Sequence, residues 1–428
     1  MTSIINSSNS NSALINTINA SDSKHNPNVY STKKIYPAAA TTYVTTTKSS
    51  GSIGANQTMV FDLMKYGIAQ QMLLVYSKDS VGDLPSGVPA LDFLEVIDRV
   101  ELLSSSKVID TLTKYDLLAQ FSNLDSSQFQ IVNKSCLEAR AASTSANLAA
   151  TKQKNQFVVP LVFGFFKDIN TNLNLQFNEP MSVRVRWGSK LDQRVGNNPV
   201  SIPDSGVFLK LRYKAYNESD FSEILTENYN EPELNQMSTG FYDENTGTQS
   251  ITQPGNGLAG VYAMDLQQPG AKVELKNTDC VNDFYICVRN NANLAAATDA
   301  PYGPVQINRV RFTASGQEIF DMEGRELFYS KLCVNGFSIL NNELSDVSNV
   351  VKIQTGLWEY AGGGTQSNTL SLRELNNPII EVWFQDDFIA APDANPVVKT
   401  YDVVVVEDAV KIYSTTSATG RLMTSLSN

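Results

Sequence analysis

Two stretches of the chain, about half its length apart, carry the same residue pattern, and this repeat limits the available folds more than any other feature. The first stretch, IDRVELLSSSKVID, spans residues 97–110, and the second, INRVRFTASGQEIF, spans residues 307–320. In both, apolar residues such as Val100 and Val310 alternate with charged ones ahead of a polar segment. Alternation around a polar break is typical of two β-strands joined by a turn. Each stretch is therefore predicted to form a β-hairpin.

Further matches follow in the same order along the two halves of the chain. FDLM and MLLVY (61–64, 72–76) match VELK and FYICV (273–276, 284–288), LNLQFNEPMSVRV (173–185) matches LSLRELNNPIIEV (370–382), and GVFLKLRYKAY (206–216) matches KTYDVVVVEDAVKIY (399–413). A single matching hairpin could arise by chance, but an ordered series could not. The pattern predicts a tandem duplication of an all-β domain.

The length of the chain agrees with a duplication, because 428 residues are too many for one hydrophobic core. Residues 51–222 and 270–417 are predicted to form two sandwiches of short antiparallel strands, separated by turns rich in Gly, Pro, Asn and Asp.

The remaining segments are polar. Residues 1–50, rich in Ser, Asn and Thr, are predicted to be a flexible N-terminal arm. Residues 223–269 contain NYNEP and QPGNG and are predicted to be a linker or long loop, while residues 418–428 form a C-terminal tail.

Two segments of the first sandwich have helical character. LTKYDLLAQFSNL (112–124) places apolar residues near helical spacing, and the Ala-rich CLEARAASTSANLAATK (136–152) follows it. Both are predicted to be helical insertions.

The chain is predicted to be soluble and to carry no targeting segment. The N-terminus lacks a basic region followed by an apolar one, and the longest apolar run, FVVPLVFGFF (157–166), contains Pro and Gly and is too short to span a bilayer. The four cysteines have neither disulfide-framework nor metal spacing, so we expect buried thiols at Cys136, Cys280, Cys287 and Cys333.

The net charge of −11 argues against a protein that coats nucleic acid, because Lys and Arg contacts to phosphate dominate that task. The arm carries four lysines, which we interpret as solubilising rather than as a nucleic-acid contact. No direct sequence-specific nucleic-acid binding is predicted.

A search for catalytic chemistry yields little. The only histidine, His25, lies in the predicted arm, which excludes a His-based triad, metal cluster or general base within the fold. GNGLAG (255–260) has the spacing of a dinucleotide-binding loop, but Pro254 replaces the strand that should precede it. We interpret this segment as linker.

Adjacent acids could serve as the carboxylate pair of a glycosidase, namely Asp386 with Asp387 or Glu407 with Asp408. Neighbouring residues of a strand point to opposite faces, so solvated turn residues are the better interpretation. The aromatic segment GLWEY (356–360) could stack on sugars, but core or interface packing is commoner for such residues. No catalytic, cofactor-binding or metal-ligating residue and no cofactor is predicted, and the chain is not expected to be an enzyme.

The ordered motifs resemble those of double jelly-roll major capsid proteins of icosahedral DNA viruses, a lineage that includes large eukaryotic DNA viruses, polinton-like viruses, virophages and lipid-containing phages. The resemblance rests on VIDRVELL with KVID and YDLL in the first half, FVVPLVFGFF and LKLRYKAY after them, and GQEI, LNNPIIEV and YDVVVV in the second half. Ser104-Ser-Ser stands where the family has a glycine turn. The resemblance covers residues 55–415.

This resemblance implies an all-β fold of two tandem eight-stranded antiparallel jelly rolls. It also implies a structural protein that forms pseudo-hexagonal homotrimers, which tile an icosahedral shell. The implied partners are neighbouring capsid trimers, minor capsid proteins and an internal membrane, and the implied location is the virion, assembled inside the host cell. On this basis the arm (1–50) would lie at the base of the tile and the 223–269 segment would form an outward tower.

Two other interpretations stay open at the sequence level. A secreted or cell-surface tandem β-sandwich that binds carbohydrate would suit the duplication, although such a protein normally begins with a signal peptide. A glycoside-active β-sandwich enzyme would need two carboxylates brought together by the fold, and the sequence nominates none.

Overall fold

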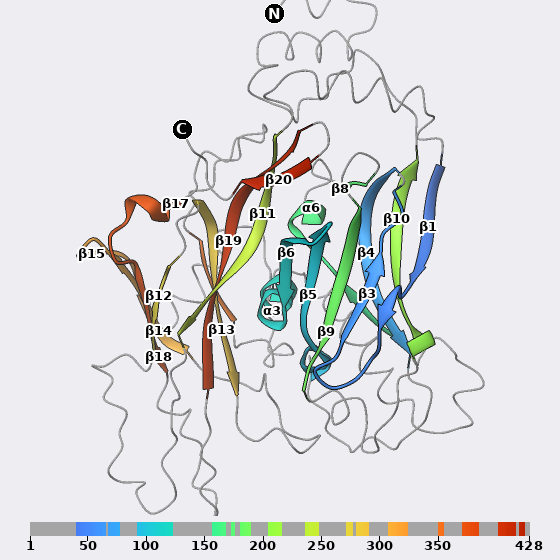
Figure 1. The fold of residues 1–428 in the computed structure, drawn as a ribbon. Coiled ribbons are helices and arrows are strands. Elements are labelled where there is room, and N and C mark those ends of the chain that lie inside the picture. Colours follow the sequence, from blue (N-terminus) through green and yellow to red (C-terminus); the bar gives the residue numbers. More distant parts are fainter. Residues whose placement is uncertain are drawn as a thin grey trace, which may run out of the picture.

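The computed structural model describes the strands and helices of the chain together with the short turns beside them. The described segments are residues 40–65, 67–77, 92–122, 156–167, 173–175, 180–189, 204–215, 236–247, 271–276, 280–290, 307–323, 350–354, 370–384, 401–416 and 419–423. Most of these residues belong to four antiparallel sheets, which we name A to D (Figure 1).

Sheets A and B form the first sandwich. Sheet A has the strand order β1 (Ala40–Thr47), β10 (Val207–Ala215), β4 (Ile68–Ser77) and β7 (Gln156–Pro160), with β8 (Leu173–Asn174) paired to β4. Sheet B has the order β2 (Ser50–Gly51), β3 (Thr58–Asp62), β9 (Met181–Trp187), β5 (Ile97–Ser104) and β6 (Lys107–Thr113).

Sheets C and D form the second sandwich. Sheet C has the order β11 (Gln236–Gly247), β19 (Tyr401–Thr416), β13 (Cys280–Asn290) and β16 (Val350–Gln354), with β17 (Leu370–Ser371) paired to β13 and β20 (Thr419–Met423) to β19. Sheet D has the order β12 (Ala271–Glu274), β18 (Ile379–Phe384), β14 (Ile307–Ala314) and β15 (Gln317–Glu323).

The two sandwiches have the same topology. We set aside the short or peripheral strands β2, β8, β17 and β20 and number the remaining eight strands of each sandwich in chain order. Sheets A and C then both have the strand order 1-8-3-6, and sheets B and D both have the order 2-7-4-5. Two facing four-stranded sheets in this order make a jelly roll. The predicted fold class, two tandem antiparallel jelly rolls, is therefore confirmed.

Each roll has a core formed by alternate residues of its strands. β9, MSVRVRW, shows the pattern most clearly, since every second side chain from Met181 to Trp187 is buried. In the same core the ring of Tyr76 stacks on Phe157, with centroids 4.8 Å apart, and meets Trp187 edge-on at 5.8 Å. Alternation thus separates a buried face from an outward polar face, as predicted for strands of a sandwich.

The repeated hairpins are β5–β6 in the first roll and β14–β15 in the second, as predicted. Their two-residue turns differ: only Ser105 has a positive φ (54°) in the first, whereas both Ser315 (52°) and Gly316 (75°) do in the second. Positive φ at both central residues is the pattern of a type I′ turn. In both hairpins the first turn residue is hydrogen-bonded to the segment that precedes the neighbouring strand of the sheet. The Ser105 amide donates to the Pro180 carbonyl (2.7 Å) before β9, and the Ser315 amide donates to the Asn376 carbonyl (2.6 Å) before β18.

The structure corrects the sequence prediction in three polar segments. β1 lies within the predicted arm (1–50), β11 within the predicted linker (223–269) and β20 within the predicted tail (418–428). β1 and β11 are edge strands that pair along their length with β10 and β19, and β20 pairs with β19. Backbone hydrogen bonds hold them, so a Thr-rich sequence such as ATTYVTTT suffices without apolar alternation. The residue limits of the two domains stay predictions.

The helices occupy the space between the two rolls. In Figure 1 sheets C and D lie to the left of the helices α3 (Lys114–Ser122) and α6 (Gly164–Lys167), and most of sheets A and B lie to the right of them. α3 confirms the helix predicted at 112–124, while the one predicted at 136–152 lies outside the described residues. Short 3₁₀ turns, η1 (Asp92–Val96), η4 (Asp204–Gly206) and η7 (Leu372–Glu374), complete the described elements. None of the described helices combines the length and apolar character needed to cross a bilayer.

Candidate functional site between the two jelly rolls

Helix α3 is one of the parts of the first roll that meet the second roll, together with α6, β6 and η1. Thr113, the last residue of β6, caps the helix: its hydroxyl accepts hydrogen bonds from the amides of Tyr115 (3.1 Å) and Asp116 (3.4 Å), and the Asp116 carboxylate accepts one from the Thr113 amide (2.6 Å). This reciprocal arrangement is a capping box. The helix contacts β6 and η1 on one side and β13, β16 and β19 on the other, so it joins the two rolls.

Sheet C is buried on both of its faces. Along β13, Phe284, Ile286 and Val288 belong to the core of the second roll, whereas Tyr285 and Cys287 belong to the core of the first. The same division holds in β16 and β19, where Val351, Ile353, Val403 and Val405 face the second core and Val350, Val404 and Val406 face the first. Burial on both faces explains the continuous apolar runs FYICV and VVVV.

The apolar part of this interface is a substantial source of stability. The side chains of Tyr285, Cys287, Val350, Val404 and Val406 are all at most 3% exposed. Burying a Val side chain stabilises by roughly 1.5–3 kcal/mol, so the three valines contribute favourably to the contact between the two rolls. The Cys287 sulfur also lies 3.8 Å from the Tyr115 carbonyl oxygen, which confirms a buried thiol at this position.

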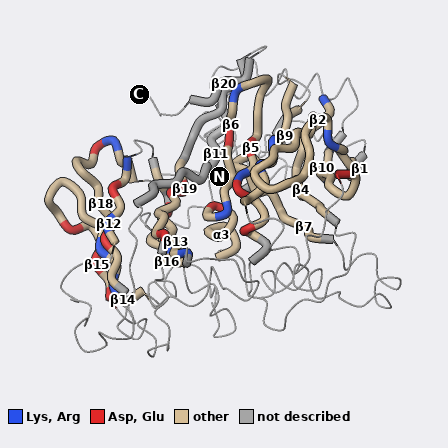
Figure 2. Tube along the Cα trace, turned by 60° about the horizontal axis from the view of Figure 1, so that its bottom comes forward, with Lys and Arg blue, Asp and Glu red and all other residues tan. Residues whose placement is uncertain are grey.

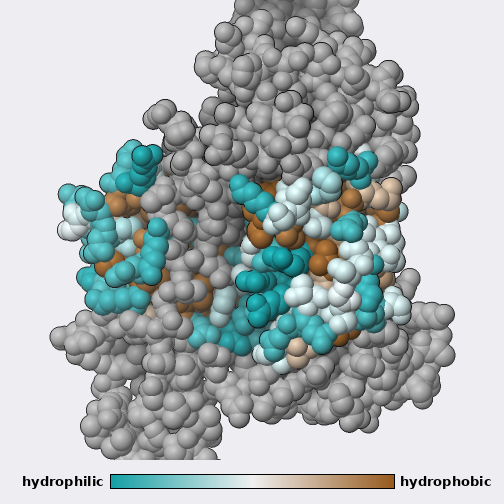
Figure 3. Space-filling model, viewed as in Figure 1, coloured by the Kyte–Doolittle hydropathy of each residue, from teal (hydrophilic) through white to brown (hydrophobic). Residues whose placement is uncertain are grey.

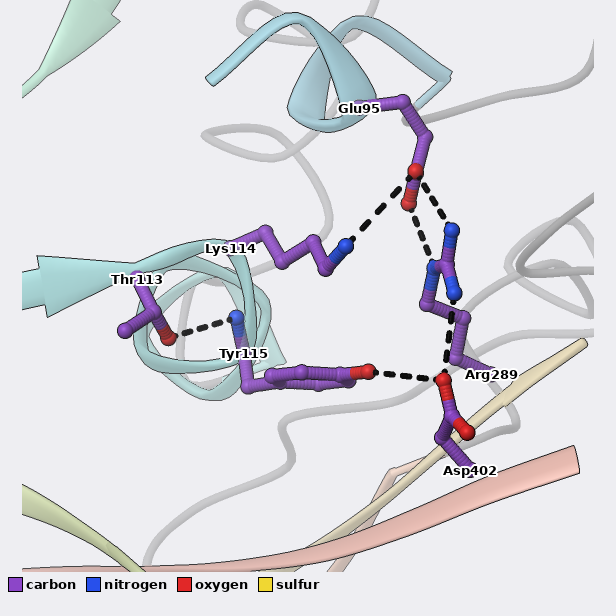
Figure 4. A network of polar contacts seen from close by, with 6 residues as sticks. All are labelled: Glu95, Thr113, Lys114, Tyr115, Arg289 and Asp402. Carbon is purple, nitrogen blue, oxygen red and sulfur yellow. Dashed lines mark hydrogen bonds and ion pairs between the residues drawn. The ribbon is translucent and has the colours of Figure 1, made fainter. Parts of the chain in front are cut away.

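A buried polar network lies beside the apolar contacts (Figure 4). Arg289 of β13 donates two hydrogen bonds of 2.7 Å to the two carboxylate oxygens of Glu95 in η1. Its third contact, 3.2 Å long, reaches Asp402 of β19, which also accepts a hydrogen bond of 3.3 Å from the Tyr115 hydroxyl. The Lys114 ammonium lies 3.8 Å from Glu95. Both members of the central pair are nearly inaccessible, with Arg289 6% and Glu95 5% exposed.

The electrostatics of this network follow from its burial. Burial lowers the pKa of Lys114 from its usual value, Glu95 opposes the shift, and Arg289 adds to it. A buried ion pair gains little net stability over apolar residues of similar size, because desolvation offsets the Coulomb attraction. Breaking such a pair is nevertheless strongly destabilising, so the network fixes one relative position of the two rolls.

The outward faces of sheets B and D carry a second set of ion pairs, at corresponding positions of the two rolls. In sheet B, Glu101 of β5 lies opposite Arg184 of β9 and forms an ion pair with it. In sheet D, Arg311 of β14 lies opposite Glu381 of β18 and donates a hydrogen bond of 2.8 Å. The acid and the base have therefore changed places between the two rolls. Charged residues recur along β12, β14, β15 and β18 (Figure 2), and hydrophilic surface covers most of the described part of sheet D (Figure 3).

Most of the residues considered as chemical candidates lie outside the described residues. These are His25, GNGLAG (255–260), GLWEY (356–360), Asp386 and Asp387, and the cysteines Cys136 and Cys333. Glu407 and Asp408 are adjacent on β19, with Glu407 fully buried and Asp408 half-buried. In the described part of the chain, no three His, Cys, Asp or Glu side chains are grouped so that they could hold a metal ion.

Sequence reasoning missed the network of Glu95, Arg289 and Asp402. A signal was present, since Arg289 ends the apolar run FYICV and Asp402 precedes VVVV. Charges at the ends of fully apolar strands are costly unless they meet a partner. The partner, Glu95, could not be identified because it lies in the other half of the chain.

The described fold is similar to that of several solved structures from viruses. No protein-family model matches the sequence, and no curated protein matches it. The PBCV-1 virus capsid is 12% identical, with a TM-score of 0.57 over 93% of this chain and 100% of that one. The Faustovirus major capsid protein is 12% identical (TM-score 0.57, 90% and 92% covered), and the mavirus major capsid protein is 10% identical (TM-score 0.50, 93% and 94% covered). At these identities the likeness concerns the fold.

Proposed function

We propose that the chain is a major capsid protein, a structural protein whose homotrimers tile the icosahedral shell of a DNA virus. The observation that carries the proposal is the junction of the two rolls, in which sheet C is buried against helix α3 of the first roll. The two rolls therefore form one rigid tile with two similar lobes. The likeness in fold to three viral capsid proteins, over at least 90% of this chain, supports the same conclusion.

A duplicated chain of this shape is suited to building a closed ring. Homo-oligomers favour closed cyclic symmetry, and three copies of a two-lobed chain present six similar lobes. The seams within such a trimer would be obligate interfaces, burying on the order of 2,000 Å² or more per pair. Contacts between trimers would be smaller and more polar. Shape and edge contacts, rather than catalysis, would constitute the function.

The partners then follow from position in the shell. Neighbouring trimers would contact the outer edges of the tile, and minor capsid proteins or an internal membrane would lie at its base. The acidic net charge of −11 disfavours direct contact with the genome, so no sequence-specific nucleic-acid binding is proposed. The protein would be made and assembled in the host cell and would reside in the virion.

Light scattering behind a sizing column tests the proposal on the full chain over a range of concentrations. We expect a mass near three times the 47.0 kDa of the chain, and particles or tiled arrays of trimers by electron microscopy. A chain that stays monomeric at every concentration would contradict the proposal. Binding in a glycan screen by such a monomer would instead support the carbohydrate-binding alternative.

A further inference from the structure

Lys352 of β16 and Asp283 of β13 form an ion pair on the face of sheet C that is turned toward the first roll. Asp283 is two positions from Tyr285, which belongs to the core of the first roll, and every second residue of a strand shares a face. Lys352 lies directly opposite Tyr285 in the pairing of the two strands, so it is a diagonal neighbour of Asp283. The Lys352 Nζ and Asp283 Oδ2 atoms are 2.9 Å apart. The amine and the carboxyl group are therefore in contact.

The surroundings of Asp283 favour the uncharged form of its carboxyl group. The side chain is only 14% exposed, and burial raises the pKa of Asp283, although the Lys352 ammonium opposes the shift. The charge of Asp408 adds to the increase. Asp408 lies on β19 at a bulge, where Asn282 and Asp283 of β13 together oppose it. A neutral carboxylic acid is more readily attacked by an amine than a carboxylate is, so this environment favours reaction at Asp283.

The side chain of Tyr285 contacts both members of the pair. Its ring centre is 5.5 Å from the Lys352 Nζ atom, and its hydroxyl donates a hydrogen bond of 3.5 Å to Asp283 Oδ2. An aromatic ring at this distance attracts and positions the amine, and a hydroxyl donor stabilises negative charge that develops on the carboxyl oxygen during attack. Tyr285 is 1% exposed, whereas the Lys352 side chain is 31% exposed, so a small product can leave along the lysine.

Three other pairs of a lysine with a carboxylate join described residues, and their acids have different surroundings. In two of them the acid also binds an arginine, and in the third the acid is 37% exposed. Hydrogen bonds from the basic partners lower the pKa of Glu381 against the effect of burial, and a hydrogen bond from Lys48 lowers that of Asp204. These pairs are Lys48–Asp204, Lys114–Glu95 and Lys272–Glu381. Of the four pairs, Lys352 and Asp283 combine a mostly buried acid with a lysine as its basic partner.

We propose that Lys352 and Asp283 condense into an amide, which joins β13 to β16 by a covalent bond. A lysine amine is an effective nucleophile when it is held against its target, and fixed contact between two reacting groups replaces an improbable encounter in solution. This inference goes beyond the proposed function and does not rest on it.

The reaction needs no reagent besides the two side chains. The Lys352 ammonium first passes one proton to the Asp283 carboxylate, which leaves a neutral amine and a neutral acid. The amine nitrogen then attacks the carboxyl carbon, the new C–N bond forms, and the C–O bond to the hydroxyl group breaks. The hydroxyl group leaves as water with a second proton from the nitrogen. Nothing is oxidised or reduced, and one positive and one negative charge disappear together.

The bond would strengthen the second roll at its contact with the first. It closes a loop between two neighbouring strands of sheet C, and a closed loop reduces the freedom of the unfolded chain, as a disulfide does. Unlike a disulfide, an amide is not cleaved by reducing agents. The strands β13 and β16 would then stay together under conditions that break hydrogen bonds and ion pairs.

Mass spectrometry of the unfolded full chain tests the proposal. We expect the chain to be lighter than its sequence requires by the mass of one water molecule. After digestion with trypsin, the peptide that contains Asp283 should be joined to the one that contains Lys352, and cleavage after Lys352 should be lost. A full-length mass without this loss would overturn the proposal. So would a loss of water confined to a single peptide, as in a cyclic imide formed by an aspartate with its neighbour.

The variant Lys352→Arg separates the covalent bond from the ion pair, because arginine keeps the positive charge but its guanidinium stays protonated and is not nucleophilic. This variant should have the full mass and should melt about 10 °C lower than the unmodified chain, since its unfolded state regains the freedom of the open loop. A loss of water that persists in Lys352→Arg would overturn the assignment of the bond.

A matched control is Lys272→Arg, because Lys272 lies 2.7 Å from Glu381 in a similar cross-strand pair. It should show the loss of water and melt as the unmodified chain does. A chain that carries the bond but stays monomeric at every concentration would contradict the proposed function and leave the cross-link intact.

Discussion

Replacing Arg289 with methionine should destabilise the chain by about 3–5 kcal/mol, because removing one partner of a buried ion pair leaves the other charge uncompensated. Methionine fills most of the volume of the arginine but donates none of its hydrogen bonds. Glu95 would lose two bonds of 2.7 Å and Asp402 one of 3.2 Å. Lys114, 3.8 Å from Glu95, partly compensates, so we expect a cost near the lower end of this range.

The double variant Glu95→Gln/Arg289→Met tests how much of the cost of Arg289→Met comes from the uncompensated charge of Glu95. Glutamine removes the buried negative charge, so the double variant should be more stable than Arg289→Met alone, by about 1 kcal/mol or more. Urea unfolding of the full chain, followed by tryptophan fluorescence and circular dichroism, measures both effects.

Arg186→Met is a matched control for this measurement. The Arg186 side chain is 42% exposed and lies 3.3 Å from Asp98 on the outer face of sheet B. Such a surface pair contributes less than about 1 kcal/mol. If Arg289→Met cost no more than Arg186→Met, the conclusion that the network fixes the position of the two rolls would be wrong.

Two further predictions concern the first roll. Burial raises the pKa of Tyr213 to about 12 from an ordinary 10.0, so the folded chain holds this proton more tightly than the unfolded chain and loses stability as the pH rises above 10. Tyr213→Phe should reduce this alkaline loss of stability, measured by urea unfolding at a series of pH values. Ser105→Gly should raise the urea midpoint by relieving a positive φ, a gain of about 1 kcal/mol, and an unchanged midpoint would argue against strain at this turn.

The repeat made much of the fold predictable. Alternation in IDRVELL and its copy identified β5 and β14, and the ordered matches located most strands of both rolls. β1, β11 and β20 could not be recognised in the same way, because edge strands are held by backbone pairing and their polar side chains carry little periodic signal. A position in the sheet, rather than residue type, makes ATTYVTTT a strand.

The candidate site was harder to predict than the fold. VVVV and FYICV indicated strands, but only the packed arrangement showed that alternate residues serve two different cores. Glu95 and Arg289 are 194 positions apart in the sequence, and no local pattern links them. Pairings across two domains depend on how the domains dock, which periodicity does not encode.

The exchanged ion pairs of sheets B and D also affect how a duplicated chain reaches its native state. Two similar halves risk a strand of one half pairing with a neighbour from the other, a characteristic failure of repeated domains. Pairing β5 with β18 would oppose Glu101 to Glu381, and pairing β14 with β9 would oppose Arg311 to Arg184. Like charges directly opposite each other are destabilising, and Glu101 and Glu381 are only 6% and 5% exposed, where water screens them little. Each half therefore disfavours pairing with the corresponding strand of the other half, which favours correct pairing within each roll as the chain folds.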